Sequence, residues 1–191
     1  MIQNRSMFHS RRGFFLTGAG AALSLSSCSK DGAETDARIK QAGKTFKMGE
    51  KAPVGPLTYT VLEATYFTQL SEAGKSRLPE KRFLVIRLAI TNGSGKEAEL
   101  PLFRLIDDQG SEISESQDAD FLPGWLGIIR RIGPTQTEEG RILFDVSPKL
   151  YKLEVTDGAE PGKEQLALVE IPIDFDTSEP VSAPAQASPR P

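Results

Sequence analysis

Alternation of apolar and polar residues with a period of two dominates the chain between residues 46 and 175. The clearest apolar series is Leu84, Ile86, Leu88 and Ile90. Side chains of a strand point alternately to opposite faces, so such a series predicts a strand with one face buried. Comparable runs occur at residues 57–66, 100–105, 141–146, 152–156 and 166–175. No segment of ten or more residues in this region has helical periodicity, so we predict an all-β domain.

Turn residues separate the predicted strands. They are the stretches Asn92–Gly95, Asp107–Gly110 and Asp157–Gly158, and such residues permit the positive φ angles of tight reversals. The apolar phase shifts by one residue after Val61, which predicts a β-bulge near Leu62. Short strands joined by such turns are typical of an antiparallel β-sandwich, here of about seven or eight strands.

The N-terminal region has the layout of an export signal. Arg11 and Arg12 precede a short apolar run, 13–25, which is below the about 20 residues that span a bilayer. Residues 10–16 resemble the twin-arginine export motif, although an ordinary secretory signal that contains two arginines is the alternative. Leu25-Ser26-Ser27-Cys28 resembles a lipoprotein lipobox, in which the cysteine is acylated after cleavage. Two or more acyl chains hold a protein stably on a membrane, so the resemblance predicts a membrane anchor at Cys28.

These features divide the chain into four regions. We predict a signal peptide over residues 1–27, a lipidated tether over 28–45, a β-sandwich over 46–175 and a disordered tail over 176–191. The tail is rich in Pro, Ala and Ser and has too little apolar surface to offset the entropy of ordering. The anchored protein would lie in the bacterial cell envelope and face the periplasm or the exterior.

Composition excludes several classes of function. Without residues 1–27 the chain keeps 20 basic residues against 26 acidic ones, a net charge of −6, which disfavours binding to nucleic-acid phosphates. The only histidine, His9, and the only cysteine, Cys28, lie outside the predicted domain. This leaves no Ser-His or Cys-His chemistry, no usual zinc site and no intrachain disulfide. We predict no cofactor and no bound metal, although calcium sites and carboxylate-pair chemistry stay formally open.

The order of the strand and turn segments resembles a known family. The matching segments are Met48–Glu50, Leu57–Val61, Phe83–Asn92, Phe103–Gly110, Gly140–Val146 and Leu153–Val155. They resemble the telokin-like, immunoglobulin-like domains of unknown function that occur in bacterial secreted proteins and lipoproteins. The resemblance covers roughly residues 48–173 and implies an immunoglobulin-like fold. It transfers no catalytic residue, and it implies an extracytoplasmic binding or accessory module.

One apolar segment within the domain is a candidate partner-binding site. It contains Phe121, Trp125, Ile128, Arg130 and Arg131, and aromatic and arginine residues are enriched at binding hot spots. The alternative is that the segment crosses between the sheets and that Trp125 fills the core.

We therefore predict a lipid-anchored module that binds an envelope protein. A small-ligand or cell-wall binding domain is the second hypothesis, and a hydrolase that uses carboxylates is the third. A flat or convex apolar patch near Trp125 would favour a protein partner, a concave pocket lined by aromatic residues would favour a ligand, and a carboxylate pair with raised pKa values in a cleft would favour an enzyme.

Overall fold

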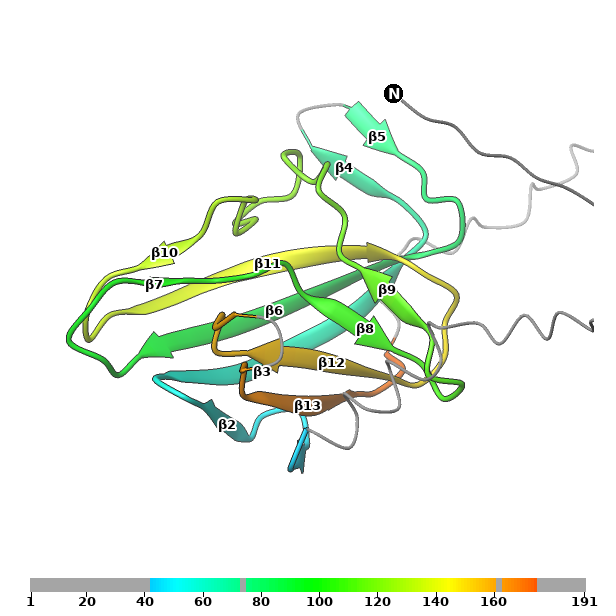
Figure 1. Cartoon of the computed structure of the whole chain (residues 1–191). Coiled ribbons are helices and arrows are strands. Elements are labelled where there is room, and N and C mark those ends of the chain that lie inside the picture. The colour runs from blue at the N-terminus through cyan, green and yellow to red at the C-terminus, as the bar shows by residue number, and fades with distance from the viewer. Residues whose placement is uncertain (1–41, 73–74, 161–162, 175–191) are drawn as a thin grey trace, which may run out of the picture.

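The computed structural model describes residues 42–72, 75–160 and 163–174. Arg11, Arg12 and Cys28 lie outside these residues, as do the predicted signal peptide, most of the tether and the tail. The described chain forms strands and no helix (Figure 1). It accordingly has no helix long and apolar enough to cross a membrane.

The strands in chain order are β1 (Thr45–Phe46), β2 (Lys51–Val54), β3 (Leu57–Phe67), β4 (Leu70–Glu72), β5 (Lys75–Arg77), β6 (Phe83–Asn92), β7 (Ala98–Glu99), β8 (Arg104–Ile106), β9 (Glu112–Ser114), β10 (Arg131–Ile132), β11 (Thr137–Asp145), β12 (Tyr151–Thr156) and β13 (Leu166–Ile171).

Two main sheets pack against each other, which confirms the predicted β-sandwich. One sheet has the order β1-β13-β12-β8-β9 and the other has the order β11-β6-β3-β2 (Figure 1). Two further pairs, β10–β7 and β4–β5, flank them. The main sheets hold nine strands, slightly more than predicted, because edge strands of two or three residues such as β1 and β9 are too short to show alternation.

The core lies between the inner faces of the two sheets. β6 pairs with β3 and with β11, and its predicted inner residues Leu84, Ile86, Leu88 and Ile90 are fully buried. The register between β3 and β6 shifts between Val61 and Glu63, so the predicted bulge at Leu62 is confirmed. The extra residue turns the Leu62 side chain outward, where it is partly exposed.

Buried tyrosines tie the two sheets together. Tyr59 on β3 donates a hydrogen bond of 2.6 Å to the carbonyl of Thr156 on β12 and contacts Phe103 edge to face. Tyr66, also on β3, donates to the carbonyl of Lys149 before β12. Burial raises the pKa of Tyr66 to about 12, so its hydroxyl remains a donor under physiological conditions. These hydrogen bonds fix the position of β3 relative to β12 in a core that is otherwise held by apolar packing.

The four-stranded sheet is also covered on its outer face. Phe83 and Val85 on β6 and Leu143 on β11 point away from the core, since they alternate with inner residues. The chain between β9 and β10, residues 115–130, packs over them, and we call it the crossover segment. Its residues Ala119 and Leu122 complete a second buried group, the outer cluster. This two-sided burial explains the continuous apolar run at residues 83–86.

The edges of the four-stranded sheet are protected. Backbone hydrogen bonds from the crossover segment cover β11: Ser116 N–H donates to Leu143, Leu126 N–H donates to Arg141, and Arg141 N–H donates to Gly124. At the opposite edge, β2 contains Pro53, which has no N–H to offer a further strand.

The packed part of the chain begins before residue 46. Thr45 pairs with Leu168 on β13, and Ala42 is buried with Ile106, Leu166 and Leu168 on the outer face of the five-stranded sheet. Residues 42–45, which the sequence placed in the tether, therefore belong to the fold. Their small and polar side chains carry no alternation that could have indicated it.

Candidate partner-binding site

The five residues predicted to contact a partner lie on the crossover segment or directly after it. The crossover segment begins after β9 of the five-stranded sheet, runs along β11 and ends at β10 (Figure 1). The structure does not bring the five side chains together on one surface. It places them in three different environments.

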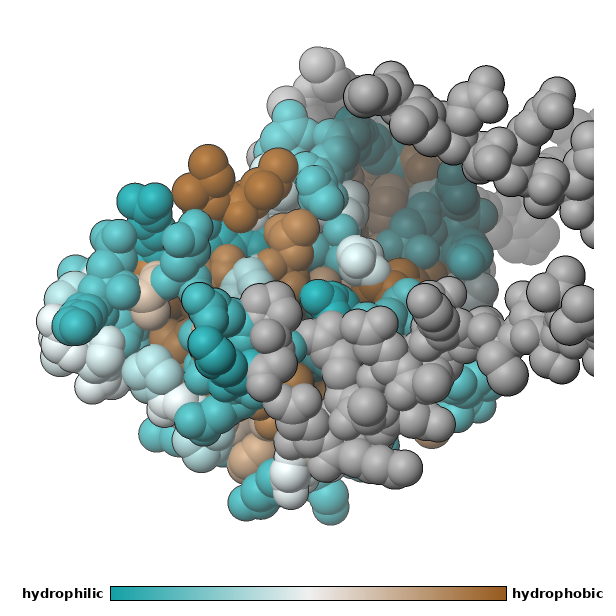
Figure 2. Space-filling view, viewed as in Figure 1, coloured by the Kyte–Doolittle hydropathy of each residue, from teal (hydrophilic) through white to brown (hydrophobic). Residues whose placement is uncertain are grey.

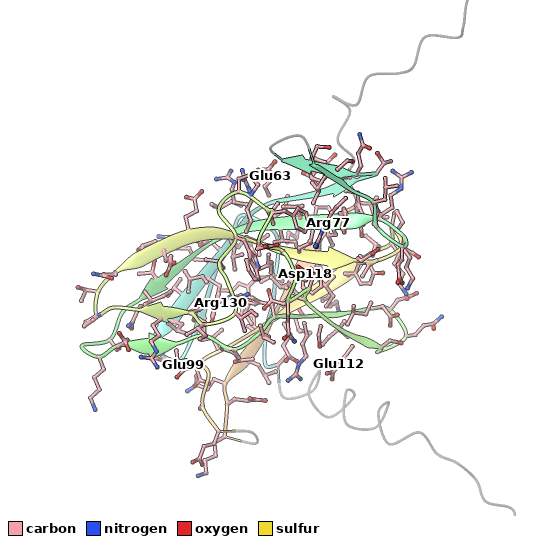
Figure 3. The ribbon with its side chains drawn as sticks, turned by 90° about the horizontal axis from the view of Figure 1, so that it is seen from above. Glu63, Arg77, Glu99, Glu112, Asp118 and Arg130 are labelled. Atoms are coloured by element: carbon pink, nitrogen blue, oxygen red, sulfur yellow. The ribbon has the colours of Figure 1, made fainter. Side chains whose placement is uncertain are left out.

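Phe121 and Trp125 face the protein rather than solvent. Both are half-buried and pack against the outer cluster. The guanidinium of Arg77 lies 4.5 Å from the ring centre of Phe121 and forms an ion pair of 2.9 Å with Asp118, so it covers the segment from the β4–β5 side (Figure 3). Trp125 therefore neither fills the core between the sheets nor forms an exposed contact residue.

Arg130, named in the sequence analysis as a candidate partner contact, is buried in the structure. Its guanidinium lies 2.8 Å from the carboxylate of Glu115, and the two side chains are 1% and 0% exposed. The ring of Phe103 lies beside the guanidinium, 5.3 Å from its central carbon to the ring centre. A charged side chain is buried this far only when a partner compensates for the lost hydration, and here Glu115 does so.

Glu115 is the residue that sequence reasoning missed. Its carboxylate accepts the Phe103 N–H at 3.0 Å and faces Arg130 inside the protein. Burial raises the pKa of Glu115, and the hydrogen bonds and charge of Arg130 offset only part of that effect. The carboxylate has no access to a cleft, so its raised pKa does not point to chemistry on a substrate.

Ile128 and Ile129 are the exposed large apolar residues of the crossover segment. Their exposed fractions are 50% and 81%, and we call the pair the isoleucine apex. Figure 2 shows hydrophobic residues on the surface where the crossover segment runs above β10. Arg131 lies next to the apex at 59% side-chain exposure and faces Glu97 at 3.7 Å. Of the predicted contact residues, Ile128 and Arg131 are thus accessible, and Ile129 joins them.

Two glycines allow this local path. Gly127 has a φ of +74°, in the left-handed region that glycine adopts without strain, and it turns the chain toward the apex. Gly140 on β11 leaves room for Leu126, because a Cβ at this position would lie 2.3 Å from Leu126 Cδ2. Leu126 can therefore pack against the core, while Ile128 and Ile129 after it project into solvent.

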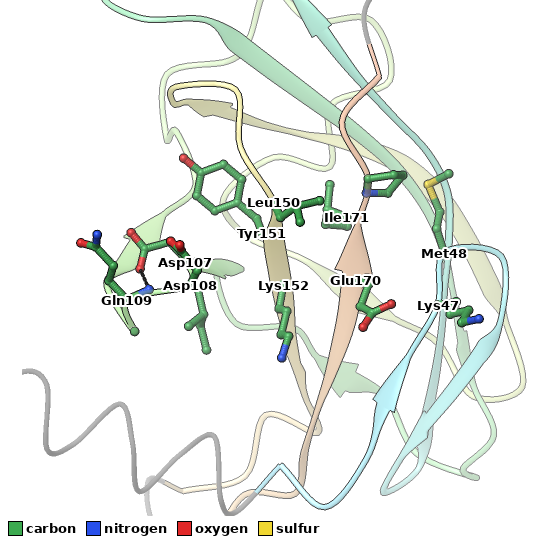
Figure 4. Close-up of a pocket in the computed structure, with 13 residues that line it drawn as sticks. Lys47, Met48, Asp107, Asp108, Gln109, Leu150, Tyr151, Lys152, Glu170 and Ile171 are labelled. Carbon is green, nitrogen blue, oxygen red and sulfur yellow. Dashed lines mark hydrogen bonds between the residues drawn. The ribbon is translucent and has the colours of Figure 1, made fainter.

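A groove of about 840 Å³ crosses one end of the five-stranded sheet. In Figure 4, Lys47 and Met48 line one side, Asp107, Asp108 and Gln109 line the other, and β12 and β13 form the floor between them. Its lining is mixed: apolar Met48, Leu150, Ile171 and Pro172 alternate with charged Lys152 and Glu170. Tyr151 is its only aromatic residue among the described residues.

Asp107 organises the turn at the groove wall, as predicted for a turn residue. Its carboxylate accepts the N–H groups of Gln109 and Ser111 and binds Lys149 Nζ at 2.7 Å. Burial alone would raise the pKa of Asp107, but these three donors outweigh it and hold the pKa below its ordinary value of 3.8.

This depressed pKa predicts a contribution to acid stability. A carboxylate that titrates lower in the folded state stabilises the fold above its unfolded pKa, and that stability is lost as the pH falls through the folded pKa. We expect Asp107→Asn, which keeps an acceptor for the turn, to flatten the loss of thermal stability below about pH 4. Melting temperatures of both proteins from about pH 7 to 2.5 measure this. Parallel curves over that range would contradict the prediction.

Metal binding finds no support in the described ranges. Within residues 42–72, 75–160 and 163–174, no three acidic, His or Cys side chains lie together in a way that could hold an ion. Asp107, one of the acidic residues around the groove, is bound by Lys149 and by its own turn.

Comparison with known proteins assigns the family. The sequence matches, over residues 46–165, the family described as a domain of unknown function, DUF4352. The chain belongs to the DUF4352 family. The match covers strands β2 to β12 and the crossover segment, and it ends before β13, which forms part of the groove floor. It confirms the expectation of a domain of unknown function, while the telokin-like attribution and the lipoprotein context stay predictions. No curated protein is significantly similar in sequence to this DUF4352 chain.

Solved structures of other bacterial proteins resemble this DUF4352 domain in fold. The yjhA protein from Bacillus subtilis has a TM-score of 0.50 and 14% identity, over 65% of this chain and 98% of its own. A functionally unknown protein from Listeria monocytogenes has a TM-score of 0.47 and 14% identity, over 65% and 82%. The secreted protein MPT63 from Mycobacterium tuberculosis has a TM-score of 0.47 and 16% identity, over 66% and 96%.

Proposed function

We propose that this protein is a lipid-anchored, extracytoplasmic module that binds an envelope protein through the isoleucine apex. The observation that carries the proposal is the pair Ile128–Ile129, which projects from a segment fastened to β11 by backbone hydrogen bonds. Two adjacent β-branched side chains on a convex, held loop lose little entropy on binding and remove apolar surface from water. The anchor at Cys28 rests on the lipobox resemblance and would keep the module at the membrane.

A double substitution at the apex tests this function. We expect Ile128→Ser/Ile129→Ser to reduce, by at least about tenfold, the adducts formed when the intact lipoprotein is crosslinked in its native envelope, as for loss of a hot spot. Because both side chains are exposed, unfolding stability should change by less than about 0.5 kcal/mol. The yields of discrete adducts on immunoblots, with chemical denaturation of the purified variants, measure the two effects.

Leu78→Ser is the matched control. Leu78 is 77% exposed and follows β5, outside residues 115–130, so removing it tests whether any exposed apolar residue suffices. We expect its adducts to match those of the unchanged protein. Equal adducts from the apex variant would refute the proposed binding site.

The groove supports a second candidate, binding of a small ligand or a cell-wall fragment. Its volume of about 840 Å³ is in the range of ligand sites. Leu150 is 66% exposed at its wall, so Leu150→Ser separates the two candidates. Loss of binding to purified cell-wall material in this variant, with the apex variant binding it fully, would favour the groove.

A further inference from the structure

Arg130 closes the loop that carries the isoleucine apex. Its Nε–H donates a hydrogen bond of 2.6 Å to the carbonyl of Gly127, three residues earlier. The side chain therefore lies under its own loop and joins the two ends of the segment that contains Ile128 and Ile129. With the loop closed from inside, the two isoleucines are left at the outer turn, where both are exposed.

The same guanidinium fastens the loop to a different part of the sandwich. It meets Glu115 at 2.8 Å and lies beside the ring of Phe103. Glu115 is itself fixed, because its carboxylate accepts the Phe103 N–H and its own N–H donates to the Phe103 carbonyl. The carbonyl of Arg130 accepts the N–H of Leu100 at 3.1 Å, which adds a backbone contact beside β7. The apex is thereby tied to the start of β8 and to β7.

A buried ion pair is a poor way to gain stability alone. Desolvation of both charges cancels much of their attraction, and apolar residues of similar volume often serve equally well. Within the described residues, Arg130 Nη1, Arg130 Nη2 and Glu115 Oε2 make no hydrogen bond, so the ion pair is incompletely compensated. What a charged pair with directional bonds does supply is one preferred geometry, as polar groups buried in other folds do.

We infer that the Arg130–Glu115 pair holds the isoleucine apex in a single presented conformation, and that Arg130 is a positioning residue for partner binding. This inference rests on the proposed function, because a fixed conformation of the apex matters for binding only where the apex contacts a partner. The pre-organised loop would avoid the ordering cost that a mobile loop incurs on binding.

Order parameters in the double variant Arg130→Met/Glu115→Leu test the inference. The paired change removes both charges, so it separates loop order from the loss of a single buried partner. We expect the backbone order parameters of Ile128 and Ile129 to fall from about 0.85, typical of rigid backbone, to below about 0.6. We also expect the Leu100 amide to exchange with solvent at least about tenfold faster, while β6 amides keep their protection.

The neighbouring exposed pair provides the matched control. Arg131 and Glu97 face each other at 3.7 Å with 59% exposure each, so Arg131→Met/Glu97→Leu removes the same charges beside the same loop. Its order parameters should stay near those of the unchanged protein. If the buried double variant fails to fold, Arg130→Lys replaces it: lysine keeps the charge at Glu115 but has no Nε–H to close the loop on Gly127. It should lower the apex order parameters by itself.

Crosslinking of the same variants in native envelopes completes the test. A drop in apex order together with a drop in adducts supports the positioning role. Unchanged order parameters overturn the inference and leave the proposed function untouched. Lower order with full adducts also overturns it, because presentation would then not matter for binding. If the unchanged protein forms no apex-dependent adduct, the proposed function fails, and the order parameters still decide whether the ion pair holds the loop.

Discussion

Replacing Arg130 alone with methionine should lower the free energy of unfolding by about 3–5 kcal/mol. Methionine can fill the space of the arginine stem, so the change leaves packing largely intact and removes the charge. Glu115 then stays buried opposite an apolar group and keeps the hydrogen bond that it accepts from the Phe103 N–H. Urea unfolding at pH 7, followed by fluorescence of the single tryptophan, measures the loss.

The pH dependence of this loss identifies its cause. Burial already raises the pKa of Glu115 with Arg130 present, and removing the cation should raise it further. The carboxyl group can then take up a proton as the pH falls, so the destabilisation of the variant should be smaller near about pH 5 than near about pH 8. Arg131→Met, at an exposed position, should change stability by less than about 1 kcal/mol at either pH. A loss that does not depend on pH would point to packing instead of charge.

Asn92→Ala should be the second most damaging substitution, with a loss of about 2–4 kcal/mol from several unmet buried groups. Asn92 ends β6 and is fully buried. Its Nδ2 lies 2.7 Å from the carbonyl of Lys96 and 3.0 Å from that of Ile132, while its Oδ1 accepts the N–H of Ser94 at 2.9 Å. The alanine variant leaves these groups without the amide that links the β6 turn to β10.

Thermal and urea unfolding measure this effect, with Ser94→Ala as the comparison. Ser94 is held by the same amide but contributes a partly exposed hydroxyl, so its removal should cost less than about 1 kcal/mol. If the free energy of unfolding of Asn92→Ala lies within about 0.5 kcal/mol of that of the unchanged protein, water or a shifted loop has replaced the amide. The structural role assigned to the Asn92 amide is then wrong.

Periodicity predicted the layered part of this fold well. The alternation in β3 and β6 identified the buried face, and the phase shift at Val61 located the bulge. These features depend on residues that are neighbours in sequence, so a window of ten residues contains the whole signal. The run Phe83–Ile86 also carried a usable signal, because apolar residues at consecutive positions of a strand indicate burial on both faces.

The candidate site could be predicted only in outline. The crossover segment stood out by its apolar content, but which side chains it exposes depends on distant contacts. Arg130 follows two isoleucines and looks like a surface residue, and Glu115 lies among other acidic residues. Either charge can be buried only because the other lies against it, although the two residues are 15 positions apart in sequence. Composition does not reveal this ion pair. The groove likewise combines four separate turns and strand ends that no local pattern connects.

The way in which the crossover segment covers β11 has a consequence for how this surface can diversify. The covering contacts run between main-chain atoms of residues 116–126 and β11, and none requires a particular side chain at Ile128 or Ile129. Exchanging those two residues would therefore change the exposed tip of the segment without uncovering a strand that other molecules could pair with in aggregates. The covered edge and the exposed tip are thus separate parts of the surface, and a substitution in one leaves the other in place.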